Sequence, residues 1–429
     1  MKKTITVFLI LCFAAALAAC GANDLYIHDP ASGAEPPAAK DTPAPVLTEP
    51  DPVVAEALGG QVILSVKNEM QSFAAPDGSG KTILSFGTDT VKVVLDDRAA
   101  AEKINQFLAM KDEMYYTGSG AGDGMYELLE LATDNYTLVK ELGTSQNTEF
   151  SCTRSVIVER GDSRILSLRY RVNSYTGGAH GLYADRVFVF DTATGSLLKL
   201  DDIASDRAAL EEAMLAKMTD LIENDVRYQP VKEYMKAFQP DLELNDALRS
   251  LFREGSWLLD DEGFAVFSDL YEIGSYADGI LRFSLSYEEL DGILREEYLP
   301  FARSESGELF IRSIDSPRSA SVILVDKVTT DEKGSEFRVF SQGTVYDVSI
   351  DSVVYISDHV GFYQTTTHWY CSYLSNAGVQ VQTLIPDGMP DLMIRYLDEN
   401  GQPHSFLITR SGEDGTVILL EEEHVEAVG

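Results

Sequence analysis

Alternating apolar and polar residues predict β-strands in much of the chain after residue 60. In the segment 164–173, for example, Leu166, Leu168 and Tyr170 alternate with polar residues. Successive side chains of a strand point to opposite faces, so this pattern is typical of a sheet with one buried and one solvated face. The same pattern predicts strands over residues 61–67, 81–86, 90–95, 150–158, 186–191, 197–200, 257–259, 264–267 and 280–286.

Helical spacing of apolar residues predicts a few helices between these strands. Asp97 is a suitable N-cap for a helix whose Ile104 and Leu108 lie on one stripe. Two further helices are expected over residues 207–224 and 230–238. Strands in sequential order with few helices indicate an α+β fold, with antiparallel sheets and a few packed helices.

The last region, residues 311–429, consists mainly of strand candidates. Tyr346, Val348 and Ile350 alternate with polar residues, which favours a small antiparallel domain. The candidates cover residues 322–328, 336–340, 344–350, 353–356, 368–374, 379–383, 392–397, 405–409 and 416–420. We therefore expect a separate, mainly β domain at this end of the chain.

The N-terminus has the layout of a bacterial lipoprotein signal. Lys2 and Lys3 precede a short apolar run, and two alanines then lead into Cys20. This order predicts a cleavable signal peptide over residues 1–19 and a lipid-bearing Cys20 as the first mature residue. The apolar run is shorter than the roughly 20 residues that a membrane-spanning helix needs. The alternative is an ordinary secretory signal with a chance cysteine.

Proline-rich residues 20–58 cannot bury enough apolar surface to fold and are expected to form a tether between the lipid and the folded part. The remaining length suits two or three domains. We expect them over residues 60–185, 186–303 and 311–429. The protein would then lie outside the cytoplasm, anchored to the cell membrane.

The chain is strongly acidic, with 34 Lys and Arg against 69 Asp and Glu and a formal charge of −35. Such a charge disfavours nucleic acid and anionic wall polymers and favours cationic partners. Solubility alone is an alternative reason for an acidic surface. Once Cys12 has left with the signal and Cys20 is lipidated, Cys152 and Cys371 remain, either as one disulfide or as two buried thiols.

A glycine-rich segment with a lone histidine is the best candidate for ligand contact. Histidine spacings typical of metal sites, such as HExxH, are absent from the sequence, as are GxSxG and P-loop motifs. We therefore predict no catalytic centre, metal or cofactor. The alternative to ligand contact is that His180 has only a structural role in the turn. The candidate ligand-binding residues are Tyr175, Gly177, Gly178, His180, Tyr271 and Tyr276.

Aromatic residues also gather in a second segment, which includes Trp369, Tyr370 and Tyr373. They could stack on a sugar face or pack in the core.

Several motifs, in this order and spacing, resemble two exported families over about residues 60–300. They are AEKINQFL (101–108), YTGGAHG (175–181), FDTATGSLLKLDDI (190–203), LLDDEGFAVF (258–267) and YEIGSYADG (271–279). The first part resembles the N-terminal domain of PdaC-type peptidoglycan deacetylases, and the second resembles the extracytoplasmic domain of RsiV-type anti-sigma factors, which respond to lysozyme. The resemblance implies recognition in the cell envelope. From the sequence, we expect neither the deacetylase domain nor a cytoplasmic sigma-binding segment in this chain.

These observations favour a lipid-anchored binding or sensing protein without its own catalytic centre. Its ligand would be a lysozyme-like cationic protein or peptidoglycan. The alternatives are a peptidoglycan-modifying hydrolase or deacetylase accessory, and a structural accessory to another envelope protein.

Overall fold

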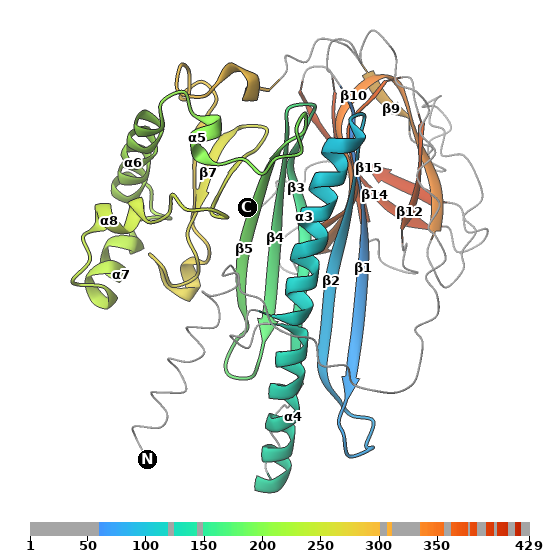
Figure 1. Ribbon diagram of the computed structural model, residues 1–429, viewed down its shortest axis with the longest axis vertical. Helices are drawn as coiled ribbons and strands as arrows, with labels where there is room; N and C mark the ends of the chain where they lie inside the picture. Colours follow the sequence, from blue (N-terminus) through green and yellow to red (C-terminus); the bar gives the residue numbers. More distant parts are fainter. Residues whose placement is uncertain are drawn as a thin grey trace.

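The computed structural model describes residues 60–118, 124–143, 149–300, 307–310, 335–355, 362–375, 378–383, 392–398, 401–410 and 417–421. A large, mostly antiparallel sheet with the strand order β15-β14-β13-β10-β11-β1-β2-β3-β4-β5 forms its centre, and β9 and β12 also pair with β10 (Figure 1). The predicted α+β class is confirmed. The strands are β1 (Val62–Ala74), β2 (Thr82–Leu95), β3 (Phe150–Gly161), β4 (Ile165–Tyr175), β5 (Leu182–Asp191), β9 (Gly307–Phe310), β10 (Ser335–Tyr355), β11 (Phe362–Ser375), β12 (Gly378–Thr383), β13 (Leu392–Leu397), β14 (Pro403–Arg410) and β15 (Val417–Glu421).

Two helices connect β2 to β3, which pair in parallel, because a parallel pair needs a crossover connection. They are α3 (Arg98–Thr117) and α4 (Met125–Leu142). Asp97 caps α3 as predicted, and its carboxylate accepts hydrogen bonds from the backbone of Ala99 and Ala100 at 2.8 and 3.1 Å. The buried face of α3 packs with β1 and β2 in one apolar cluster. Helix α4 has no counterpart among the elements that the sequence pattern predicts.

A smaller layer packs beside β3, β4 and β5. It holds a sheet of β6 (Trp257–Leu259), β7 (Gly263–Phe267) and β8 (Arg282–Ser286). Helices α6 (Arg207–Asn224) and α7 (Pro230–Phe238) have the bounds that the sequence predicts. The short elements are α5 (Leu200–Ile203), α8 (Leu244–Arg249), η1 (Tyr276–Asp278) and η2 (Glu296–Tyr298). Met214, Met218 and Phe283 are fully buried in the core of this layer.

The large sheet extends across two of the predicted domain divisions. The one between residues 185 and 186 falls inside β5, which pairs with β4 from Leu182 to Asp191. The C-terminal strands join the first strand of the fold, because β11 pairs with β1 with Ile63 opposite Cys371. The pairing of β1 with β11 brings together segments far apart in the sequence, which a local pattern cannot connect.

Other predictions differ from the structure only locally, or cannot be compared with it. The expected strands 81–86 and 90–95 form the single strand β2. The signal peptide 1–19, Cys20, the tether 20–58 and the strand candidate 322–328 lie outside the described residues. Among the helices that are described, none has the length and hydropathy needed to cross a membrane.

Candidate ligand-binding site

The β4–β5 hairpin ends in a glycine-rich turn that presents His180 to solvent. Gly177 and Gly178 have φ angles of 95° and 103°, a region that side chains with a Cβ rarely adopt. The Tyr175 hydroxyl donates a hydrogen bond to the Gly178 carbonyl at 3.1 Å. These three predicted site residues therefore shape the turn, and the exposed His180 stands at its end.

His180 contacts both predicted tyrosines, which follow it by about ninety residues in the sequence. Its ring stacks on Tyr276, with ring centroids 3.8 Å apart and an interplanar angle of 25°. The Tyr271 hydroxyl lies 3.5 Å from His180 Nε2, and the Tyr271 and Tyr276 ring centroids are 6.0 Å apart. The structure thus joins three of the candidate residues into one aromatic cluster at the surface, in which His180 is exposed and both tyrosines are half-buried.

Tyr183 of β5 completes this cluster, although sequence analysis did not select it. Its ring meets Tyr276 edge-on, with centroids 6.3 Å apart. Gly279 has a φ of 70°, and a Cβ at this position would stand 2.8 Å from the Tyr183 hydroxyl. The glycine therefore lets the loop approach the strand closely. We call His180, Tyr183, Tyr271 and Tyr276 the aromatic cluster.

The loop that carries Tyr271 and Tyr276 is tied to β5 by ion pairs. Asp269, at its start, binds Arg186 of β5 at 2.9 Å and Arg253 at 2.9 Å. Arg253 also binds Glu272 at 2.6 Å. The positions of the two tyrosines thus depend on contacts between the smaller layer and the large sheet.

A buried carboxylate lies near the aromatic cluster on β5. Asp185 binds Arg171 at 2.8 Å and Arg169 at 3.1 Å. Burial by itself would raise the pKa of Asp185, but hydrogen bonds from Arg171 and the charge of Arg169 hold that pKa below its usual value. Arg171 also lies 5.6 Å from the centre of the Tyr183 ring. The charges beside the cluster are therefore largely compensated within the protein.

The aromatic cluster offers ring faces, tyrosine hydroxyls and an imidazole at one exposed place. Aromatic rings stack on the apolar faces of sugars and on cations, while hydroxyls and imidazole nitrogens donate or accept hydrogen bonds. This combination can bind a ligand. Over the part of the chain that is described, no group of three or more His, Cys, Asp or Glu residues could hold a metal ion.

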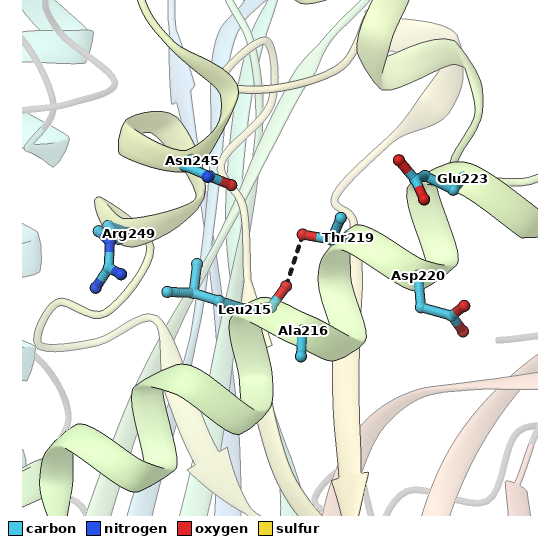
Figure 2. A pocket seen from close by; sticks show the side chains of 7 residues that line it. All are labelled: Leu215, Ala216, Thr219, Asp220, Glu223, Asn245 and Arg249. Carbon is cyan, nitrogen blue, oxygen red and sulfur yellow. Dashed lines mark hydrogen bonds between the residues drawn. The ribbon is translucent and has the colours of Figure 1, made fainter.

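A separate surface groove of about 400 Å³ lies between α6 and α8. Figure 2 shows Asn245 and Arg249 of α8 on one side of the groove and Glu223 and Asp220 of α6 on the other, with the Thr219 hydroxyl bonded to the Leu215 carbonyl at 2.8 Å. All these side chains except Leu215 and Thr219 are exposed. None of the predicted site residues lines this groove.

The remaining candidates from the sequence are buried. Cys152 and Cys371 are both free thiols in the interior, so the open choice between one bridge and two thiols is resolved in favour of two thiols. Burial raises the pKa of Cys371 to about 12. Trp369, Tyr370 and Tyr373 are at most 4% exposed, which favours packing over sugar binding.

Comparisons with known proteins identify one part of the chain. Residues 201–288 match the family DUF3298, described as a protein of unknown function. No curated protein matches the chain. A solved DUF3298 family protein from Pseudomonas aeruginosa PAO1 is 17% identical, covers 55% of this chain and 97% of its own, and has a TM-score of 0.39. A DUF3298 family member from Bacteroides fragilis is 19% identical, covers 55% of this chain and 94% of its own, and has a TM-score of 0.38. The smaller layer, from α5 to the end of β8, therefore contains a DUF3298 domain.

Proposed function

We propose that this protein is a lipid-anchored component of the cell envelope that binds a ligand without catalysing a reaction. The order of charged residues, apolar run, alanines and cysteine at residues 2–20 supports an anchor at Cys20. The anchor would hold the described part of the chain outside the cytoplasm. There, soluble proteins and wall material are the available partners.

The convergence of the aromatic cluster carries this proposal. Two sequence segments, one in the large sheet and one in the DUF3298 domain, place His180 and Tyr276 in stacked contact at the surface. Exposed aromatic rings are favourable contacts for a ligand. Two glycines at positive φ and a network of ion pairs fix this arrangement, so the cluster is organised before any ligand arrives.

The ligand that fits best is a lysozyme-like cationic protein or peptidoglycan. The net charge of −35 supports attraction of a cationic protein. The resemblance to PdaC-like and RsiV-like domains supports the same choice, and the predicted RsiV-like part, residues 186–303, includes the DUF3298 match at residues 201–288. Aromatic faces would suit the sugar rings of peptidoglycan.

Binding by the chain from residue 21 to residue 429, which keeps every described residue, tests the proposal. The immobilised protein is exposed to lysozyme and to purified peptidoglycan at low and high salt. We expect retention of at least one, with lysozyme binding weakened by salt. Replacing both His180 and Tyr276 by alanine should weaken binding at least about tenfold. The matched control is Tyr126→Ala, which removes an aromatic ring that is 62% exposed on α4. If the immobilised protein retains neither lysozyme nor peptidoglycan, the proposed binding function is wrong.

The anchor has its own test. Mass spectrometry of the protein from cells should find acyl chains on Cys20 and no residues 1–19. A Cys20→Ala variant should lack the lipid. An intact chain beginning at Met1 as the dominant species would contradict the envelope location.

A further inference from the structure

Tyr271 has an unusual backbone conformation within the aromatic cluster. Its φ angle is 62°, and among the described residues only Asp347 shares a positive φ without being glycine. This region is unfavourable for a residue with a bulky side chain, and such residues persist where the surrounding structure holds them. Contacts that hold Tyr271 in place therefore control one side of the cluster.

Helix α7 and the residue that follows it supply two such contacts to consecutive carbonyl groups. The Tyr234 hydroxyl donates a hydrogen bond to the Tyr271 carbonyl at 2.6 Å. The Gln239 side-chain amide donates one to the Glu272 carbonyl at 2.7 Å. Both donors are side chains, so the loop depends on the identity of residues that are far from it in the sequence.

Helix α7 is itself fixed in the core of the DUF3298 domain. Val231 and Met235 are 1% and 4% exposed and belong to the main apolar cluster of this layer. Tyr234 also packs on Phe238 of the same helix, with ring centroids 5.0 Å apart. The helix can therefore serve as a rigid support for the loop.

We propose that Tyr234 and Gln239 are positioning residues that keep Tyr271 in its left-handed conformation and thereby keep Tyr276 stacked on His180. Without these hydrogen bonds, Tyr271 would relax to a negative φ. The direction of the following loop would then change, because Tyr276 is only five residues further along. The role of these residues in ligand binding rests on the proposed function, whereas their effect on the stack does not.

The stack can be followed by NMR of the chain from residue 21 to residue 429 with 13C-labelled histidine, because the Tyr276 ring shifts the His180 ring protons. Tyr234→Phe removes only the hydroxyl. We expect the His180 signal to move toward its position in the unfolded chain, and to move further when Gln239→Leu is added. Tyr228→Phe is the matched control, since the Tyr228 hydroxyl also donates to a carbonyl, that of Arg282, at 2.6 Å.

A double-mutant comparison tests the role of the backbone conformation. Glycine adopts positive φ without strain, so Tyr234→Phe should have little effect on the His180 signal when Tyr271 is already glycine. An effect as large as in the native background would overturn the proposal. So would an unchanged His180 signal in Tyr234→Phe, or an equal change in Tyr228→Phe.

Ligand binding separates this inference from the proposed function. If the His180 signal moves as expected and lysozyme or peptidoglycan binding weakens with it, both stand. If the signal moves while the binding of both ligands is unchanged, the positioning role stands and the proposed site is wrong.

Discussion

Two of the clusters in which aromatic rings lie beside a charged or basic group differ in burial. In the exposed one, His180 stacks on Tyr276 at the surface. In the buried one, the Arg154 guanidinium lies 4.5 Å from the centre of the Tyr115 ring and 5.0 Å from that of Tyr170. Arg154 is 6% exposed. The two clusters therefore differ in what they can contact, because only rings at the surface can touch a ligand.

The carboxylates beside the two clusters show the same difference. Burial outweighs Arg154 and raises the pKa of Asp112, whereas Arg171 and Arg169 outweigh burial and lower the pKa of Asp185. The two pKa values shift in opposite directions because Asp185 has two arginine partners and Asp112 has one. The buried cluster joins α3 to the sheet, whereas the aromatic cluster lies at the surface, where the charge of Asp185 beside it is compensated by Arg171 and Arg169.

The largest effect is expected from the buried cluster. Arg154→Ala should lower the free energy of unfolding by about 3–5 kcal/mol, because it removes a buried guanidinium and leaves the partly buried Asp112 carboxylate without its partner. Urea unfolding measures this loss. Arg227→Ala, which breaks the exposed ion pair with Asp225, should leave the unfolding midpoint unchanged. A loss for Arg154→Ala as small as for this control would mean that the cluster is not structural.

The sequence predicts local elements well where one apolar stripe or alternation continues without interruption. Helices over residues 207–224 and 230–238 and the cap at Asp97 are confirmed. Helix α4 was missed because glycines precede it and because exposed Leu131, Leu138 and Leu142 blur its apolar face. The pairing of β1 with β11 joins residues about three hundred positions apart, and no local pattern encodes it.

In the candidate site, too, local motifs could be recognised from the sequence, whereas contacts between distant segments could not. The glycines of the turn and the residues His180, Tyr271 and Tyr276 were selected from motifs, and the structure brings the last three together. Tyr183 was missed because the predicted strand began at residue 186, whereas β5 begins at Leu182. Had the predicted strand been extended back to Leu182, Tyr183 would have been placed on β5 beside the turn. The positive φ of Tyr271 has no signal in the sequence, because it depends on Tyr234.

A smaller effect should follow from crowding the exposed cluster. Gly279 has φ 70° and ψ −155°, a region nearly restricted to glycine, so Gly279→Ala should lower the free energy of unfolding by about 1–3 kcal/mol. The added Cβ should also displace the Tyr183 hydroxyl. Gly292→Ala is the control, since Gly292 has φ 71° but open space around it. Equal losses in urea unfolding would show that the contact with Tyr183 does not matter.

The pH dependence of stability should differ in sign between the two carboxylates. The folded-state pKa of Asp185 is lowered, so its contribution is present above the unfolded value near 4 and is lost as the pH falls through the folded pKa. Asp185→Asn should therefore make the protein less sensitive to acid below about pH 4. The raised pKa of Asp112 acts in the opposite direction, so Asp112→Asn should make the acid-induced loss steeper. Urea unfolding from pH 7 downward measures both slopes, and slopes that change in the same direction would contradict the assignment.

The smallest effect on stability is expected where the effect on binding is largest. His180 is exposed and contacts Tyr276 and Tyr271 at the surface, so His180→Ala should change the free energy of unfolding by no more than about 0.5 kcal/mol. The same variant should lose part of the binding to lysozyme or peptidoglycan, because ring contact with a ligand would be removed. The aromatic cluster would instead be structural if His180→Ala destabilised the protein as much as Arg154→Ala does. A loss of binding with unchanged unfolding would show that the His180 ring contributes to ligand contact and not to stability, unlike Arg154 in the buried cluster.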